Sequence, residues 1–387
     1  MLRWACDRAG TDIPALAGRF PKLPEWLSTT AQPTFKQLED FAKATHTPFG
    51  YFFLPEPPEE PVPIPDLRTV GGARVARPSA NMLDTIYLCQ QRQDWYHQHA
   101  LLMNDMPLAF VGSVPAGASV VQTAASIRDE LGLDALRNAA VRSTADAFRC
   151  LLDRADGAGI LVMVNGIVGN NTRRPLDPDE FRGFALVDSL APLIFVNGAD
   201  TKAAQLFTLA HEIAHIWAGE SGVSDVTTAS APRVETERWC NAVAAEVLIP
   251  LAELQKALQK DADLWDEANR LARQFGVSTL VVLRRMLDAG WLTRDEHAAA
   301  YGQESARLSA LMHARKESGE GGGDFYRTAK PRLSTRFARA VIASTWEGRS
   351  TFTEAFRLLG CRSLKTLDNL ARSIGMGNPT AWEGGSN

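Results

Sequence analysis

Apolar positions along the first fifty residues recur at helical spacing, in short stretches separated by turn residues. The pattern predicts a helix opening at Asp12, a second over 23–27, and a third over 35–44 with Thr34 as its N-cap. Six prolines then fall within residues 55–65, where they favour an extended, polyproline-like backbone. A small helical domain followed by a linker is therefore expected at this end of the chain.

Helical and strand-like patterns both occur in the middle of the chain. In order, they predict helices over 79–107, 123–133 and 143–156 and strands over 159–164, 184–187 and 193–197. From about Pro250 onward the pattern is again mostly helical. Several helices around a small sheet, flanked by all-helical regions, indicate an α+β fold.

Changes in composition divide the chain into five expected segments. The prolines separate the first helices from the rest, and the glycine-rich run at 319–323 interrupts the helical pattern near the other end. The expected segments are a helical domain over 1–54, a linker over 55–78, a central domain over 79–260, a three-helix region over 261–318, and a glycine-rich loop with a basic helical region over 319–387.

Composition narrows the class of protein. Of the 387 residues, 45% are hydrophobic and 22% are charged, which is typical of a globular protein and argues against disorder or a fibrous repeat. No apolar run approaches the roughly 18–20 residues of a membrane-spanning helix, and the first residues lack a secretory signal. The five cysteines are scattered without a CxxC pair, which argues against a disulfide framework. A cytoplasmic protein without membrane contact is expected.

Charge is unevenly distributed along the chain. The net charge of −4 argues against a wholly basic nucleic-acid-binding protein. From Asp324 to the end, however, ten Lys or Arg residues stand against five Asp or Glu residues. This basic end is a candidate contact with an acidic partner.

The most informative stretch is the motif HEIAH. On a helix, His211 and His215 lie one turn apart on the same face, so both imidazoles can bind one metal ion. Glu212 follows the first histidine, where its carboxylate can reach a metal-bound water and act as the general base. Small residues around the motif favour a closely packed helix, which Gly219 can end. The motif predicts a catalytic zinc site.

Such a site needs a third protein ligand and leaves one position for water. On the next predicted helix, Glu237 is the candidate ligand, and Asn241 one turn further is a candidate for orienting a ligand. Glu235 and Glu246 compete for the same role, although Glu235 lies at the predicted helix start and Glu246 on another face. One Zn²⁺ is expected, with Mn²⁺ and Fe²⁺ as alternatives that the same ligand types admit.

Zinc bound in this way predicts a hydrolase, with a peptide bond as the favoured substrate and a small molecule as the alternative that HExxH alone leaves open. The ion lowers the pKa of its bound water toward about 7, and Glu212 takes the proton and then passes it to the leaving amine. The group that stabilises the oxyanion stays open. The candidates are His297, His313, Tyr301, Tyr326 and several arginines.

The motifs HEIAH and ExxxNxxAAEVLIP together resemble the signature of the ImmA/IrrE family of zinc metallo-endopeptidases. The stretches LRWACDRAG and PFGYFFLPEPP resemble the Xre-type helix-turn-helix domain often fused to these peptidases, and RLSTRFARAVI resembles their C-terminal extension. The resemblance implies a zincin-like peptidase domain over 79–260, with a small sheet and the HExxH helix, behind an Xre-like domain over 1–54.

The resemblance also implies a substrate. In related zinc peptidases the strand before the motif pairs with the substrate backbone. The strand in that position comprises Leu193, Ile194, Phe195, Val196 and Asn197. Members of the family cleave transcriptional repressors after a stress or mobile-element signal, which implies a repressor as the protein substrate and a role in transcription regulation.

Two stretches are candidates for DNA contact. The Xre-like stretch FPKLPEW contains only Lys22 as a cation beside two prolines and a glutamate, so docking to a protein is favoured over sequence-specific DNA binding. Residues 267–285 have a better helix-turn-helix pattern, in which Ser278 caps the second helix and Arg284 and Arg285 lie near its end. The alternative function is a DNA-binding regulator or antitoxin-like protein with a structural or silent metal site.

Overall fold

The computed structural model describes residues 1–65, 78–133, 143–224, 233–259, 261–317 and 333–377. These residues divide into two compact units. One comprises Met1–Pro63 and the start of helix α5 (Ala80–Met103) as far as Tyr87, and the other comprises Ile64, Pro65 and the described residues from Leu88 onward. Within the described ranges, none of the helices combines the length and the hydropathy that a membrane span requires.

The first unit is built from short helices around an aromatic core. They are α1 (Leu2–Arg8), α2 (Ile13–Arg19), α3 (Leu23–Leu27), α4 (Phe35–Ala44) and a 3₁₀ helix, η1 (Phe49–Phe53). The side chains of Trp4, Phe20, Trp26 and Phe41 are buried between them. Thr34 accepts a hydrogen bond from the backbone N–H of Gln37 and caps α4, so the predicted helices and this N-cap are confirmed.

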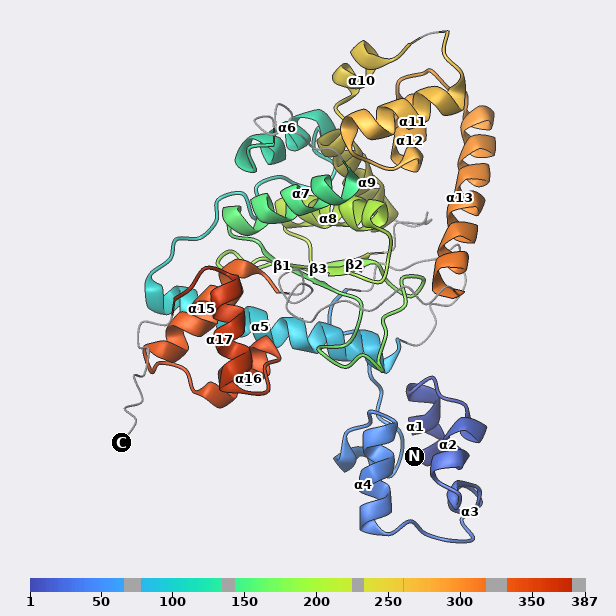
Figure 1. Cartoon of the computed structure of the whole chain (residues 1–387), viewed down its shortest axis with the longest axis vertical. Helices are drawn as coiled ribbons and strands as arrows, with labels where there is room; N and C mark the ends of the chain where they lie inside the picture. Colours follow the sequence, from blue (N-terminus) through green and yellow to red (C-terminus); the bar gives the residue numbers. More distant parts are fainter. Residues whose placement is uncertain (66–77, 134–142, 225–232, 260, 318–332, 378–387) are drawn as a thin grey trace. The chain divides into compact units, whose positions relative to one another are not determined.

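The second unit contains a four-stranded sheet (Figure 1). Its strands are β1 (Leu161–Asn165), β2 (Gly183–Leu186), β3 (Leu193–Asn197) and β4 (Gly222–Ser224), in the order β1-β3-β2-β4. β1 runs parallel to β3, whereas β2 runs antiparallel to both β3 and β4. The predicted α+β fold with a small sheet is confirmed.

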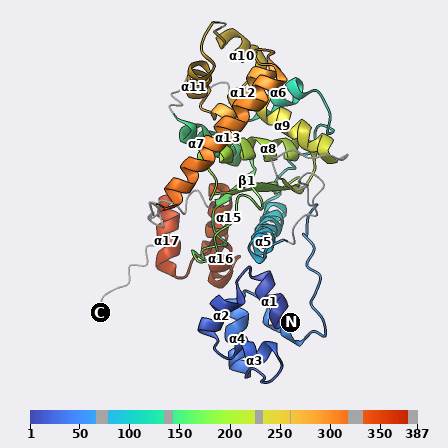
Figure 2. The same ribbon diagram turned by 90° about the vertical axis from the view of Figure 1, so that its right-hand side faces the viewer.

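Helices lie on both faces of this sheet (Figure 1, Figure 2). One face packs under α6 (Val120–Glu130), α7 (Thr144–Ala158), α8 (Lys202–Ala218) and α9 (Arg233–Leu248), sharing a core with them. Strand side chains alternate between the faces, so Ala185 and Ile194 join that core. On the opposite face, Gln93 of α5 donates hydrogen bonds to the carbonyls of Leu186 and Ala191.

Four more helices follow the sheet domain along the chain. They are α10 (Leu251–Ala257), α11 (Leu264–Phe275), α12 (Thr279–Asp288) and α13 (Arg294–Glu317). Gly276, with a φ of 68°, ends α11, and the Ser278 side chain accepts a hydrogen bond from the Val281 N–H to cap α12. Two helices joined by a short turn thus lie in this stretch, with Ser278 as the cap of the second.

The last described elements are α15 (Thr335–Trp346), α16 (Phe352–Leu359) and α17 (Leu364–Ser373). Two side chains of the sheet domain donate hydrogen bonds to this group of helices. Arg92 of α5 donates to the Leu358 carbonyl at 3.0 Å, and Asn170 donates to the Gly360 carbonyl at 2.6 Å. The glycine-rich run at 319–323 lies outside the described residues, and the predicted domain borders stay predictions.

Candidate metal centre

The HEIAH motif lies on helix α8 in the second unit. Thr201 caps its start by accepting a hydrogen bond from the Ala204 N–H, and Gly219 ends it in the left-handed conformation with a φ of 73°. The side chains of His211, Glu212 and His215 are completely buried. Burying three ionisable groups on adjacent turns costs free energy unless each group binds a partner. The residues around them therefore determine the chemistry of the site.

The third donor comes from α9, which packs along α8. The Nε2 atoms of His211 and His215 lie 3.1 Å apart, and the Glu237 carboxylate oxygens lie 3.1 Å from the first and 3.2 Å from the second. Two imidazoles and a carboxylate at about 2.0–2.1 Å from a tetrahedral zinc ion would be about 3.3 Å apart. The three side chains therefore fit a zinc ion in both donor type and spacing.

The charges in this cluster depend on one another. Burial raises the pKa of Glu237, but hydrogen bonds and charge from the two histidines outweigh it and hold that pKa at about 2. Burial lowers the pKa of His211, but the Glu237 carboxylate reverses that shift, so the pKa of His211 is raised overall. For His215 burial prevails and the pKa is lowered. Glu237 is thus an anion inside the protein, as a metal ligand must be.

Asn241 lies one turn after Glu237 on α9. Its side-chain Oδ1 is 3.0 Å from Nδ1 of His211. Because an amide oxygen only accepts, His211 donates its Nδ1–H there, which leaves the Nε2 lone pair directed at the cluster. The structure thus places Asn241 where it holds one histidine in the tautomer and orientation that metal binding needs.

Glu212 lies against strand β2 rather than within the cluster of three. A Cβ atom built on Gly183 would be 3.1 Å from Oε1 of Glu212, 2.6 Å from Cγ2 of Thr208 and 2.8 Å from the carbonyl oxygen of Phe195. Only glycine fits between the sheet and α8 at this point. Sequence reasoning missed Gly183, although a glycine opening a buried strand is a signal of close approach.

Gly183→Ala is expected to lower the free energy of unfolding by about 1–3 kcal/mol, because the added methyl group overlaps backbone and side-chain atoms. It should also reduce hydrolysis by displacing Glu212. Urea unfolding and the rate of hydrolysis per bound zinc measure the two effects separately. The control is Gly157→Ala on α7, where no atom lies within 4 Å of the built Cβ. Equal stability of the two variants would contradict the close contact at Gly183.

The two competing carboxylates lie elsewhere. Glu235 is exposed at the start of α9. Glu246 is buried and binds the Arg285 guanidinium of α12, and it also accepts a hydrogen bond from the Leu251 N–H at 3.2 Å. Arg285 in turn donates to the Ile249 carbonyl at 3.0 Å. Glu246 therefore joins α9 to α10 and α12, while Glu237 alone of the three carboxylates reaches the histidines.

Glu246→Ala is expected to lower the free energy of unfolding by about 3 kcal/mol while leaving zinc content unchanged. The reason is that the buried Arg285 loses its main carboxylate partner, whereas the metal cluster loses nothing. Chemical denaturation and metal analysis on the same samples check this. Glu235→Ala on the same helix serves as the exposed control. Loss of zinc from Glu246→Ala alone would reassign the third ligand.

The prediction that Leu193–Asn197 pairs with a substrate is wrong. This segment is β3, which is hydrogen-bonded to β1 on one side and to β2 on the other, so no edge is left for a further strand. Both β1 and β4 are edge strands within the described sheet. Of these two edge strands, β4 pairs with β2, and Ser224 of β4 lies directly opposite Gly183 of β2. Gly183 is the residue that Glu212 packs against.

None of the four residues predicted for DNA contact belongs to the metal cluster, and Lys22 is part of the first unit. Lys22 is exposed before α3, and Ser278 uses its hydroxyl to cap α12. Arg284 is exposed and bonded to Asp288. The prediction for Arg285 is not supported, because its side chain is buried and bound to Glu246.

The oxyanion candidates remain open. His297 and Tyr301 have ring centroids 5.5 Å apart on α13. Tyr326 lies outside the described residues, and the side chain of His313 is not among those described. Among the described residues, neither His297 nor Tyr301 contributes a hydrogen bond or ion pair to the metal cluster.

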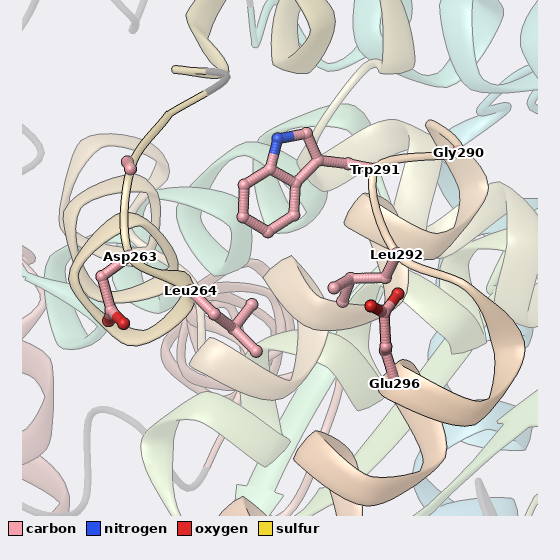
Figure 3. Close-up of a pocket in the computed structure, with 7 residues that line it drawn as sticks. Asp263, Leu264, Gly290, Trp291, Leu292 and Glu296 are labelled. Carbon is pink, nitrogen blue, oxygen red and sulfur yellow. The ribbon is translucent and has the colours of Figure 1, made fainter.

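A pocket between the start of α11 and the α12–α13 connection shares no residue with the metal cluster (Figure 3). Trp291 and Leu264 give it apolar walls. Its two carboxylates have structural roles: Asp263 accepts from the Trp265 and Asp266 N–H groups, and Glu296 accepts from the Thr293 N–H. The described pocket is therefore not the centre to which the motif belongs.

Comparison with known protein families agrees with this placement of the site. Residues 155–287 match the model of the IrrE N-terminal-like domain, a peptidase domain, and this range contains the whole sheet from β1 to β4 together with α8 and α9. Residues 333–373, which form α15 to α17, match a domain of unknown function (DUF8813). No curated protein matches the chain. The ImmA/IrrE resemblance is thereby confirmed for 155–287 as a metallopeptidase-type domain, whereas no family match supports the Xre-like domain over 1–54.

Proposed function

We propose that this protein is a zinc-dependent endopeptidase that hydrolyses peptide bonds in a protein substrate. The observation that carries the proposal is the cluster of His211, His215 and Glu237, whose donor atoms lie within 4.8 Å of one another. Glu212 directly follows His211 on α8. Three protein ligands with a neighbouring carboxylate are the pattern of a catalytic site, because one position on the ion is left for water or substrate.

Zinc is favoured over other divalent metals by the donor set. Two neutral imidazoles and one carboxylate at nearly tetrahedral spacing suit zinc, whereas manganese and iron usually take more ligands in wider arrangements. Asn241 supports the same assignment, since its bond to His211 Nδ1 leaves Nε2 as the donor atom.

The chain's own residues divide the reaction between them. A bound zinc ion would supply Lewis acidity, which polarises a peptide carbonyl and lowers the pKa of water. Glu212 takes the proton from the attacking water and carries it to the nitrogen of the leaving amine. Gly183 has no side chain and so leaves space for the Glu212 carboxylate. Because Glu212 is buried, its carboxylate is shielded from bulk water. Asn241 holds His211 in place throughout.

The substrate is proposed to be a transcriptional repressor, cut as part of a stress-response or mobile-element switch. Support for a polypeptide substrate comes from β4, an edge strand whose register places it beside Glu212, since an extended peptide can pair with such an edge. The choice of a repressor rests on the ImmA/IrrE resemblance. DNA contact through the α11–α12 pair stays part of the same proposal, with Ser278 and Arg284 as its remaining residues.

The direct test is to incubate the zinc-loaded chain with purified repressors encoded near its own gene and to identify fragments by mass spectrometry. Cleavage at a defined bond by the wild type, and none by Glu212→Gln, is the expected result. Fluorescent casein serves as a general substrate in parallel. A zinc-loaded wild type that leaves every neighbouring repressor and casein intact would refute the proposed function.

A further inference from the structure

The helices α15, α16 and α17 form a bundle with buried apolar residues of its own. Helix α15 packs against both α16 and α17 (Figure 1). Each helix contributes apolar side chains that are buried, among them Phe337, Leu358 and Leu367. The family model that matches residues 333–373 is a domain of unknown function, so it assigns this bundle no role.

Helices α16 and α17 are joined by a short turn with a defined stop and start. Gly360, with a φ of 68°, ends α16 in the left-handed conformation. The Ser363 side chain accepts a hydrogen bond from the Thr366 N–H and caps α17. A turn of about three to four residues that contains glycine is typical of the DNA-binding helix-turn-helix, whose second helix enters the major groove. The connection of α16 to α17 therefore fits a pair of helices that reads DNA.

Positive charge is concentrated in this bundle. Residues 333–373 contain seven Lys or Arg residues and three Asp or Glu residues, a net charge of +4. With 41 basic and 45 acidic residues in the whole chain, 34 basic and 42 acidic residues lie outside the bundle, a net charge of −8. Lys and Arg that neutralise phosphates supply the sequence-independent part of DNA affinity. The bundle thus carries the charge that DNA binding needs, on a chain that is otherwise acidic.

One side of α17 combines two cations with groups that can bind bases. Lys365 and Arg372 are exposed and lie seven residues apart, so they share a face. Their separation along the helix is about 10 Å, close to the roughly 12 Å width of the major groove. Between them on this face lie Asp368 and Asn369, and Leu364 at the helix start is 56% exposed. Amide, carboxylate and apolar side chains contact adenine, cytosine and the thymine methyl group respectively.

The cations of α17 are available to a ligand. Within the described ranges, neither Lys365 nor Arg372 forms an ion pair. In the α11–α12 pair, by contrast, Arg270 and Arg284 each pair with a carboxylate of their own helix, and Arg285 is buried against a carboxylate of α9. A cation that already has a partner must give it up before it binds a phosphate. This difference favours α17 as the helix that enters a groove.

We propose that the α15–α17 bundle binds double-stranded DNA, with α17 in the major groove and Lys365 and Arg372 on the phosphates that flank it. Binding there needs neither the metal cluster nor hydrolysis, because the bundle contributes no residue to the cluster. Where the proposed peptidase function also holds, the bundle keeps the peptidase domain on DNA, close to protein substrates that are themselves bound to DNA.

The test measures binding of the full zinc-loaded chain to a fluorescent DNA duplex of mixed sequence, by anisotropy, between about 50 and 200 mM salt. Lys365→Gln/Arg372→Gln removes two cations from α17, and the control, Arg149→Gln/Arg154→Gln, removes two exposed cations from α7. Each phosphate contact contributes about 0.9 to the slope of log K against log salt. The slope is therefore expected to fall by about 1.8 in the α17 variant and to keep its wild-type value in the control.

Several outcomes would overturn the proposal. They are a wild type that shows no salt-dependent binding, an unchanged slope in the α17 variant, and an equal fall in both variants. A wild type that binds polyglutamate but not the duplex would make an acidic protein the partner instead of DNA. An RNA duplex of the same length is expected to bind more weakly, because its major groove is too narrow for a helix, and equal affinity would contradict the placement of α17. Since no hydrolysis is measured, failure of this proposal is distinct from failure of the proposed function.

Discussion

Glu212→Gln is expected to reduce peptide hydrolysis by about 10²–10⁴-fold while about one zinc ion stays bound per chain. Glutamine has nearly the shape of glutamate and fits the same space beside Gly183, but it cannot take a proton from water. The metal ligands are on other side chains, so the cluster of three is left intact. Rate per bound zinc, measured with the repressor fragments or with casein, checks this prediction.

The matched control for that variant is Glu235→Gln. Glu235 is an exposed glutamate on α9, close in sequence to the ligand Glu237, and its change to an amide should leave both rate and zinc content at wild-type values. A Glu212→Gln variant that keeps the wild-type rate would remove Glu212 from the mechanism. Loss of zinc from that variant would instead assign Glu212 a role as a ligand.

Loss of a metal ligand is expected to have the second large effect. His215→Ala and Glu237→Ala should each reduce zinc content from about one ion per chain to near zero, because two donors remain where catalytic zinc sites have three. Each variant should also unfold at lower urea concentration. A ligand held only by the folded state, at about 1,000 times its Kd, adds about 4 kcal/mol to the free energy of unfolding.

Mass spectrometry of the metal in samples purified without chelators checks the ligand variants, and a chelator added to the wild type should reproduce their lowered stability. Glu235→Ala again serves as the control, since Glu235 is exposed and outside the cluster. Retention of zinc by Glu237→Ala would contradict the ligand set. A wild type that contains no metal even when supplied with zinc would contradict the entire centre.

Local pattern was sufficient to predict the parts of the site that lie on single helices. The i, i+4 spacing of His211 and His215 puts them on one face of any helix, whatever surrounds it. The same holds for Glu237 and Asn241 on α9. Caps at Thr34 and Ser278 and the glycine stop at Gly219 follow from hydrogen bonds between near neighbours, so the helix ends could also be predicted.

Choosing among the three carboxylates of α9 needed more than helical periodicity. Periodicity favoured Glu237, but it could not show that Glu246 is bound to Arg285, which lies 39 residues further along the chain. The same ion pair removed Arg285 from the residues available to DNA. Such a pairing depends on how α12 packs against α9 and α10, and no local sequence pattern encodes that packing.

The sheet is the clearest case in which the sequence predicted the elements but not their arrangement. The residues of β1, β2 and β3, but not those of β4, were predicted as strands, yet the order β1-β3-β2-β4 places the strand that precedes the motif in the interior rather than at the edge. Strand order is set by long-range hydrogen bonding between segments whose spacing in sequence does not reveal their neighbours. The substrate strand was therefore predicted on β3, while the edge beside Glu212 belongs to β4.

By itself, the sequence determined the α+β class, the helix that holds His211, Glu212 and His215, and the expectation of a metal, because these follow from spacing within one helix and from side-chain chemistry. Tertiary structure alone decided that Glu237 completes the cluster and that Gly183 makes room for Glu212. Each of these contacts joins segments far apart in the chain. Their geometry depends on the packing of the sheet against α8 and α9, which local patterns do not specify.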